Sequence, residues 1–199
     1  RAAAQQQTEA LFRLGHFYRT GQGVTKNPSR AVLLLYAAAM NGDANAMKEL
    51  EDMARAEPSR PEAVLFGQRL DHTDRNSMRT ALRQYGATII REDDAYICDL
   101  YDAAKVAPGA RQMAICYGPG KPGPLGFLEL DYTAPNNTVE GMILKMVTDR
   151  FGKASAGEGD DAHLWNLGSV VVATRYEPTR GQFSLMYMVP RVYHLTRQR

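Results

Sequence analysis

Residues 10–50, ALFRLGHFYRTGQGVTKNPSRAVLLLYAAAMNGDANAMKEL, determine how the first part of the chain folds. Apolar residues recur every three or four positions over Thr8–Thr20 and over Ser29–Met40, and this spacing places them on one face of a helix. Asn27 followed by Pro28 marks the start of the second helix, because asparagine caps free backbone N–H groups and proline fits the first helical position. The stretch therefore predicts a pair of helices joined by a loop that contains glycine.

The beginning of this pattern returns further along the chain. Ala10 and Leu14 recur as Ala46 and Leu50, 36 positions later, on a third helix that Asp43 can cap. A fixed period of ~30–40 residues is typical of arrays of helix pairs, because one pair cannot bury its own apolar face without a stacked neighbour. The offset therefore predicts a helical repeat.

The residues between these positions carry a family pattern: Ala10, Leu14-Gly15, Tyr18, Gly21, Gly23-Val24, Asn27, Arg30-Ala31, Ala38-Ala39, Gly42, Ala44 and Ala46. This pattern resembles the Sel-one-like repeat, a relative of the tetratricopeptide repeat. The sequence departs from the family at Leu34 and Leu35, where aromatic residues are usual, and at Glu51, where a second copy would repeat Gly15. We therefore expect one full repeat and half of another over Thr8–Met53.

Two further helices are expected to cap this short array. Ser59-Arg60-Pro61-Glu62 has the form of a capping box and predicts a short helix to about Leu70. Asp74 can cap a second helix whose apolar residues reach Tyr85, and Gly86 is a stop signal. A helical domain over residues 1–86 follows.

After Gly86 the periodicity changes from helix to strand. The alternation of apolar and polar residues predicts strands at Thr88–Arg91, Arg111–Tyr117 and Leu125–Tyr132, a helix from Asn137 to Gly152, and two long strands at Leu164–Tyr176 and Gln182–Leu195. Strands in sequence with short connections favour an antiparallel sheet. We therefore expect an α+β protein whose domain over residues 87–199 holds a mainly antiparallel sheet.

The charge and composition exclude several classes of protein. The 199 residues carry a formal net charge of +2, which is too small for a strongly electropositive nucleic-acid surface. No apolar run approaches the ~20 residues that a transmembrane helix needs. Without a CxxC or HxxxH motif, we expect no metal and no cofactor.

The two cysteines, Cys98 and Cys116, are 18 residues apart and leave two alternatives open. A disulfide between them would close a loop and favour an extracytoplasmic location such as the periplasm, whereas two buried thiols would act as small apolar residues. The chain starts at Arg1-Ala2-Ala3 without an initiator methionine, as expected after removal of a signal peptide or after trimming at a domain boundary.

Polar residues on the predicted repeat helices are candidates for partner binding: His16, Arg19, Asn45, Lys48 and Glu49. His16 and Arg19 do not match the family pattern, whereas Tyr18 does and is expected to pack between helices. A solvated helix face is the simpler interpretation of the same residues.

A second cluster is a possible pocket or loop site: Asp160, Asp161, His163 and Trp165. Carboxylates beside a histidine suit acid–base chemistry or cation binding, although a solvated acidic loop before a strand explains them equally. The acidic residues around Cys98 are interpreted as a polar linker: Glu92, Asp93, Asp94, Asp99 and Asp102. No catalytic residue is assigned.

The resemblance implies a non-enzymatic interaction or adaptor protein whose partner is another protein or a peptide, since such repeats generally act as scaffolds and in bacteria often outside the cytoplasm. In this interpretation the helical repeat braces or presents the second domain. The alternative is a small-ligand-binding or hydrolytic domain in residues 87–199. Its pocket would be lined by Trp165, Tyr187, Tyr193 and His194.

Overall fold

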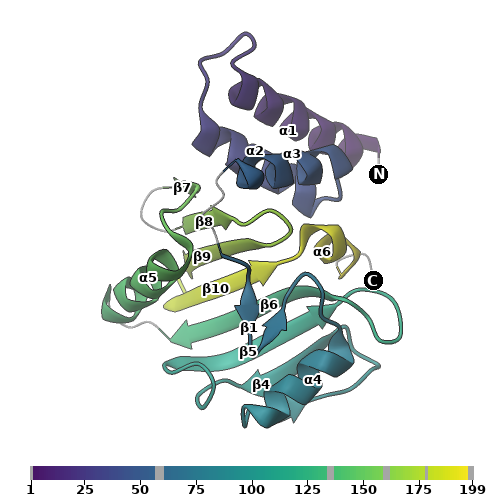
Figure 1. The fold of residues 1–199 in the computed structure, drawn as a ribbon, viewed down its shortest axis with the longest axis vertical. Helices are drawn as coiled ribbons and strands as arrows, with labels where there is room; N and C mark the ends of the chain where they lie inside the picture. Colours follow the sequence, from purple (N-terminus) through teal and green to yellow (C-terminus); the bar gives the residue numbers. More distant parts are fainter. Residues whose placement is uncertain (1, 57–60, 134–136, 159–161, 178, 197–199) are drawn as a thin grey trace.

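The computed structural model describes residues 2–56, 61–133, 137–158, 162–177 and 179–196, and it begins with the predicted three helices (Figure 1). These are α1 (Ala2–Thr20), α2 (Pro28–Met40) and α3 (Ala44–Arg55). The caps are confirmed: the Asn27 side chain accepts a hydrogen bond from Arg30 N at 3.0 Å, and Asp43 accepts one from Ala46 N at 2.8 Å. The first helix starts earlier than the sequence pattern predicts.

The rest of the chain forms an antiparallel sheet of eight strands, so the predicted α+β class is confirmed. The order across the sheet is β3-β4-β5-β6-β10-β9-β8-β7. The strands are β3 (Thr88–Arg91), β4 (Cys98–Asp102), β5 (Ala110–Tyr117), β6 (Leu125–Thr133), β7 (Ala156–Glu158), β8 (Ala162–Asn166), β9 (Val171–Glu177) and β10 (Gln182–Met188).

The sheet consists of two successive runs of four strands. The run β3–β6 follows α4 (Arg75–Gln84), and the run β7–β10 follows α5 (Asn137–Phe151). Within each run, neighbours in sequence are neighbours in the sheet. The two runs meet at the centre, where the last strand of each, β6 and β10, pair over seven residues from Gln182↔Thr133 to Met188↔Phe127.

Each face of the sheet buries its own hydrophobic cluster. On one face, apolar residues of α4 and α5 pack against alternate residues of the strands, among them Met113, Leu128 and Leu185. On the other face, α2 and α3 pack against Leu164 and Val171 of the β7–β10 run. The sheet is therefore a middle layer. On the face that α2 and α3 cover, α1 is the outermost helix (Figure 1).

The predicted helix from Ser59 to Leu70 is wrong over the described part of that range, which begins at Pro61. The structure has a small hairpin there, β1 (Val64–Leu65) paired with β2 (Gln68–Arg69). Phe66 and Gly67 both have positive φ, 51° and 70°, as a tight two-residue hairpin turn requires.

The two long strands predicted near the end of the chain are also wrong in extent. Gly168, with φ of 90°, turns the chain between β8 and β9, so the range Leu164–Tyr176 holds two short strands. The range Gln182–Leu195 ends as a strand at Met188, and α6 (Pro190–Thr196) follows. Proline has no N–H for a sheet and fits the first helical position, which explains where the helix starts.

The expectation that the two helices predicted between Ser59 and Tyr85 cap the repeat is wrong as well. Met78 and Leu82 of α4 are buried in the cluster on the opposite face of the sheet, whereas the sheet itself covers α2 and α3. The division into domains at residue 86 stays a prediction. Because α4 shares the core of the sheet, we propose that the second folding unit begins before α4.

Candidate functional site

A groove of about 670 Å³ lies between the first half of α1 and the turn that joins α2 to α3. Amide-bearing and charged side chains line much of it: Gln5, Gln7, Glu9, Arg13, Asn41 and Asn45. Phe12 provides an aromatic wall, and its ring centroid lies 6.2 Å from that of His16. The groove therefore combines apolar contact with groups that both donate and accept hydrogen bonds.

The close packing of α1 on α2 depends on Gly15. A Cβ atom at this position would lie 2.9 Å from Leu35 Cγ, which is closer than real Cβ contacts allow. Gly42, with φ of 93°, turns the chain from α2 into α3. Two glycines of the repeat pattern thus set the positions of the helices that form the groove.

Three of the predicted partner-binding residues form an ion cluster beyond the groove. On α3, Glu49 Oε1 lies 2.6 Å from His16 Nδ1, and Glu49 Oε2 forms an ion pair with Arg19 Nη1 at 3.1 Å. Because His16 and Arg19 belong to α1, these contacts join α1 to α3. The Glu49 side chain is only 12% exposed. These three residues therefore already hold the repeat together.

The other two predicted residues remain on the surface. Asn45 lines the groove, one turn of α3 before Glu49, and Lys48 is exposed on the same helix. Tyr18 packs against the cluster around α2, as expected, and the Arg30 guanidinium lies 4.8 Å from its ring centroid.

The second predicted cluster is only partly visible, because Asp160 and Asp161 lie outside the described residues. Trp165 is 1% exposed, and its Nε1 donates to the Gly152 carbonyl at 2.9 Å, so it packs against the end of α5 as a core residue. The His163 ring lies 6.1 Å from that of Trp165.

The aromatic residues proposed to share a pocket are dispersed. Tyr187 faces α5. Tyr193 lies on the other face of the sheet, with α2 and α3, where its ring centroid is 5.4 Å from that of Phe127. His194 lies beside Gly42. These side chains therefore do not form one site.

The sequence does not predict a buried network of ion pairs between α4 and β4. Arg79 of α4 binds both carboxylate oxygens of Asp99 at 2.8 Å, and Asp99 is fully buried. The hydrogen bonds to Asp99 raise the pKa of Arg79, and burial raises the pKa of the neighbouring Tyr117. Asp99 and Asp102 belong to β4, so the interpretation of this stretch as a polar linker is wrong at these two positions.

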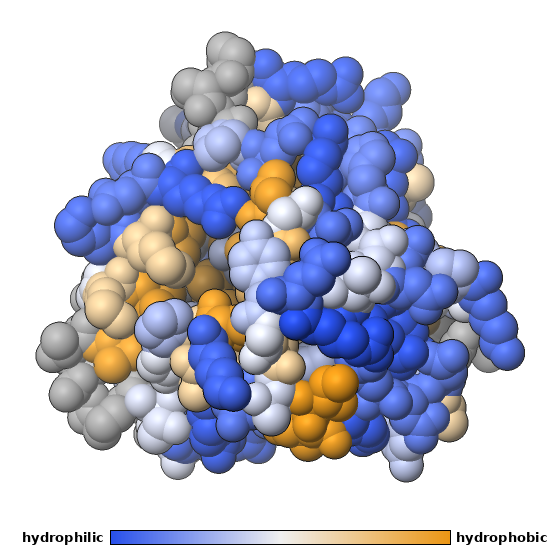
Figure 2. All heavy atoms as spheres, turned by 60° about the horizontal axis from the view of Figure 1, so that its bottom comes forward, coloured by the Kyte–Doolittle hydropathy of each residue, from blue (hydrophilic) through white to orange (hydrophobic). Residues whose placement is uncertain are grey.

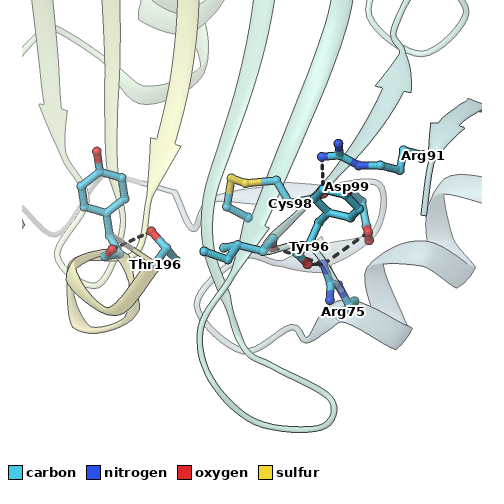
Figure 3. The surroundings of a disulfide bond; sticks show 9 residues. Arg75, Arg91, Tyr96, Cys98, Asp99 and Thr196 are labelled. Carbon is cyan, nitrogen blue, oxygen red and sulfur yellow. Dashed lines mark hydrogen bonds and ion pairs between the residues drawn. A yellow bond between two sulfur atoms is a disulfide. The ribbon is translucent and has the colours of Figure 1, made fainter. Parts of the chain in front are cut away.

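The disulfide Cys98–Cys116 joins β4 to β5 at directly paired positions, close to this network (Figure 3). Arg75 reaches the same region, where its Nη2 donates to the carbonyls of Tyr96 and Ile97 at 2.6 and 3.2 Å. Since such bonds persist in oxidising environments, the disulfide is consistent with an extracytoplasmic location.

The described part of the chain contains no group of three or more His, Cys, Asp or Glu residues that could hold a metal ion. Within the same residues, no helix has the length and apolar character needed to cross a membrane.

Comparison with known proteins confirms the repeat. Residues 8–43 match the Sel1 repeat family, a repeat of the protein-interaction type. A solved structure with a distant likeness is that of a DUF4309 family protein (YjgB) from Bacillus subtilis, which is 13% identical. The match covers 70% of this chain and 93% of that chain with a TM-score of 0.37. No curated protein matches the sequence.

Proposed function

Because residues 8–43 form a Sel1 repeat, we propose that this protein is a non-enzymatic interaction module that binds an extended segment of a partner protein. The binding site is the groove between α1 and the α2–α3 turn. The antiparallel sheet is the support that holds the repeat in position.

The observation that carries this proposal is that one side of the repeat is buried and another side is exposed to solvent. Its α2 and α3 side is buried against the sheet, through Leu35 and Leu50 on the helices and Val171 on β9. The groove on the other side remains open at Asn45 and Arg13. A rigid support behind an open groove reduces the entropy lost on binding, because the site does not have to be ordered first.

The chemistry of the groove suits a peptide backbone. Amide side chains donate to carbonyl oxygens and accept from N–H groups, and Gln5, Gln7 and Asn45 provide such groups along its length. Arg13 pairs with Glu9 one turn before it on α1, and Asp43 adds one negative charge to the lining of the groove. We therefore expect a partner segment of mixed polar and apolar residues, in the oxidising compartment that the disulfide favours.

Selection from a displayed library of random peptides tests the site. We expect peptides that bind the whole protein with micromolar affinity and lose about tenfold or more with Asn45→Arg, because the larger charged side chain would fill the groove. The matched control is Lys105→Glu, a charge change at an exposed residue of the β4–β5 connection, away from the groove.

Two results would contradict the proposal. One is the failure to select any peptide from the library. The other is the selection of peptides whose affinity is the same for wild type and Asn45→Arg, or is lost equally with Lys105→Glu.

A further inference from the structure

A second cavity, of about 400 Å³, lies on the opposite side of the molecule between α5 and the sheet. Its walls are apolar side chains of α5 and of the central strands, including Ile143, Val147, Leu130 and Leu185. Figure 2 shows hydrophobic residues gathered around a hollow on this side of the molecule. The volume lies in the range of ~300–1,000 Å³ that is typical of small-molecule sites.

The mouth of the cavity is formed by flexible apolar side chains. Met142 and Met146, one turn apart on α5, are 54% and 48% exposed although they are large and apolar. Methionine adapts its shape to apolar ligands, because its side chain is unbranched and polarizable. Exposed methionines beside an apolar cavity therefore favour the entry of an apolar chain.

Three polar groups stand at this otherwise apolar site. Arg150 lines the cavity at the end of α5, where one of its Nη atoms donates to the Val64 carbonyl of the hairpin and holds the guanidinium in place. Tyr132 and Tyr187 also line it, and neither hydroxyl forms a hydrogen bond with any residue in the described ranges. The remaining N–H groups of Arg150 and the two hydroxyls are available to a ligand.

We propose that this cavity binds a small amphipathic carboxylate, with its hydrocarbon chain between α5 and the sheet and its carboxylate at Arg150. The apolar walls match the chain, which gains free energy from each CH₂ group that it removes from water. The guanidinium matches the carboxylate in charge and in the geometry of its paired donors.

The state of Tyr187 agrees with this assignment. Burial raises its pKa to about 12, and the positive charge of Arg150 opposes that rise, so the two side chains are electrostatic neighbours. The phenol therefore keeps its proton at physiological pH and can donate it in a hydrogen bond to an anion.

Titration with dodecanoate below its micellar concentration tests the proposal, with binding followed by calorimetry and by the fluorescence of Trp165. This residue is the single tryptophan of the chain. Its Nε1 donates a hydrogen bond to the carbonyl of Gly152, which follows the cavity residue Phe151 in the sequence. We expect saturable binding of one molecule per chain, and about tenfold weaker binding of the uncharged dodecanol.

Variants separate the charge from the cavity. Arg150→Gln is expected to weaken dodecanoate binding about tenfold and to leave dodecanol binding unchanged. The matched control Lys145→Gln removes a positive charge from the same helix outside the cavity lining and should change neither. Val147→Phe, which fills the cavity, should abolish binding of both ligands while circular dichroism stays native.

Equal affinities for dodecanoate and dodecanol, together with no effect of Arg150→Gln, would overturn the assignment of the carboxylate. If binding is not saturable, or survives in Val147→Phe with unchanged affinity, the cavity is not the site. If Val147→Phe does not fold, Met146→Lys at the mouth replaces it and must weaken dodecanol binding. Asn45→Arg should bind dodecanoate like wild type, so failure here is distinguishable from failure of the peptide-groove proposal.

Discussion

At the scale of single residues, Asp99 on β4 is the buried charged group that binds α4 to the sheet. It is fully buried and is bound at both oxygens by Arg79, while Arg75 approaches to 3.4 Å. Sequence reasoning interpreted Asp99 as part of a solvated linker, because a run of acidic residues is usually exposed. Its burial depends on two arginines about twenty positions earlier, which only the packing of α4 on β4 brings close.

Replacing Asp99 by alanine should destabilise the protein by about 2–4 kcal/mol, because Arg79 would lose its paired bond to a buried carboxylate and keep mainly its contact with the exposed Asp94. Chemical denaturation measures this change. The control Asp149→Ala breaks the exposed pair with Lys145 and should cost below about 1 kcal/mol. Similar losses of stability in the two variants would show that Asp99 is not a buried partner of Arg79.

Glu129 on β6 is a residue whose charge costs stability. Burial, followed by the negative charge of Asp131, raises the pKa of Glu129 above the ordinary value, although the nearby Ser184 hydroxyl and the positive charge of Arg175 oppose the rise. For an acid with a raised folded-state pKa, the stabilising contribution is complete below the unfolded pKa and is lost as pH rises through the folded-state pKa.

Glu129→Gln should therefore be more stable than wild type at about pH 7, and the difference should vanish at about pH 4 or below. Denaturant midpoints measured over this range check the prediction. The exposed Glu9→Gln is the matched control, and it should show no such gain. A gain that is the same at every pH would point to packing in place of charge.

At the scale of elements, the sequence predicts those whose signals are local. The caps Asn27, Asp43 and Asp74 each accept the expected backbone hydrogen bond, and the three helices that they cap start where the pattern predicts. The hairpin at Val64–Arg69 was missed because its strands are two residues long, too short for a periodic pattern. Pro190 is the sequence signal that marks the start of α6. The alternating apolar residues on both sides of it resemble one continuous strand and conceal the change from strand to helix.

The short helix α6 is seated on the sheet at a glycine. A Cβ atom on Gly126 of β6 would lie 2.8 Å from Thr196 Cγ2 and 3.3 Å from the backbone nitrogen of Tyr193. Since neither the strand nor the helix backbone can yield freely, any larger residue must displace α6.

Gly126→Val should destabilise the protein by about 1–3 kcal/mol through overpacking. Gly141→Ala is the control, because this glycine lies within α5 with no atom in the way of an added Cβ, and the change should stabilise by about 0.5–1 kcal/mol. Thermal unfolding measures both. Equal midpoints for the two variants would contradict the account of how α6 is seated.

At the scale of the whole molecule, the repeat and the sheet share one hydrophobic cluster. Predicting the α+β class needed only the change in periodicity near Gly86, whereas the sites needed tertiary structure. The groove combines residues of α1 with Asn45 on α3, and the cavity combines α5 with strands from both runs. No local sequence pattern gives these distances. Asn45 is therefore predicted among residues that do not line the groove, and Arg150 is not predicted at all.

Removing the helical array should therefore damage the sheet. A chain of residues 61–199 exposes the face formed by Leu164, Val171 and Met188, which α2 and α3 bury in the whole protein. We expect it to bind the dye ANS and to aggregate, whereas the whole protein unfolds in one cooperative transition. If the shorter chain unfolds cooperatively with the midpoint of the whole protein, the repeat is an independent domain.

The meeting of the two strand runs at β6 and β10 has a kinetic consequence. Every other strand pair in the sheet joins neighbours in sequence, which close small loops, whereas Ser184 bonds to Asp131 across 53 positions. Because closing a longer loop costs more entropy before any contact forms, the central seam should assemble last. Pulsed hydrogen exchange during refolding should then protect the amides of both runs first, and those shared by β6 and β10 in the slowest phase.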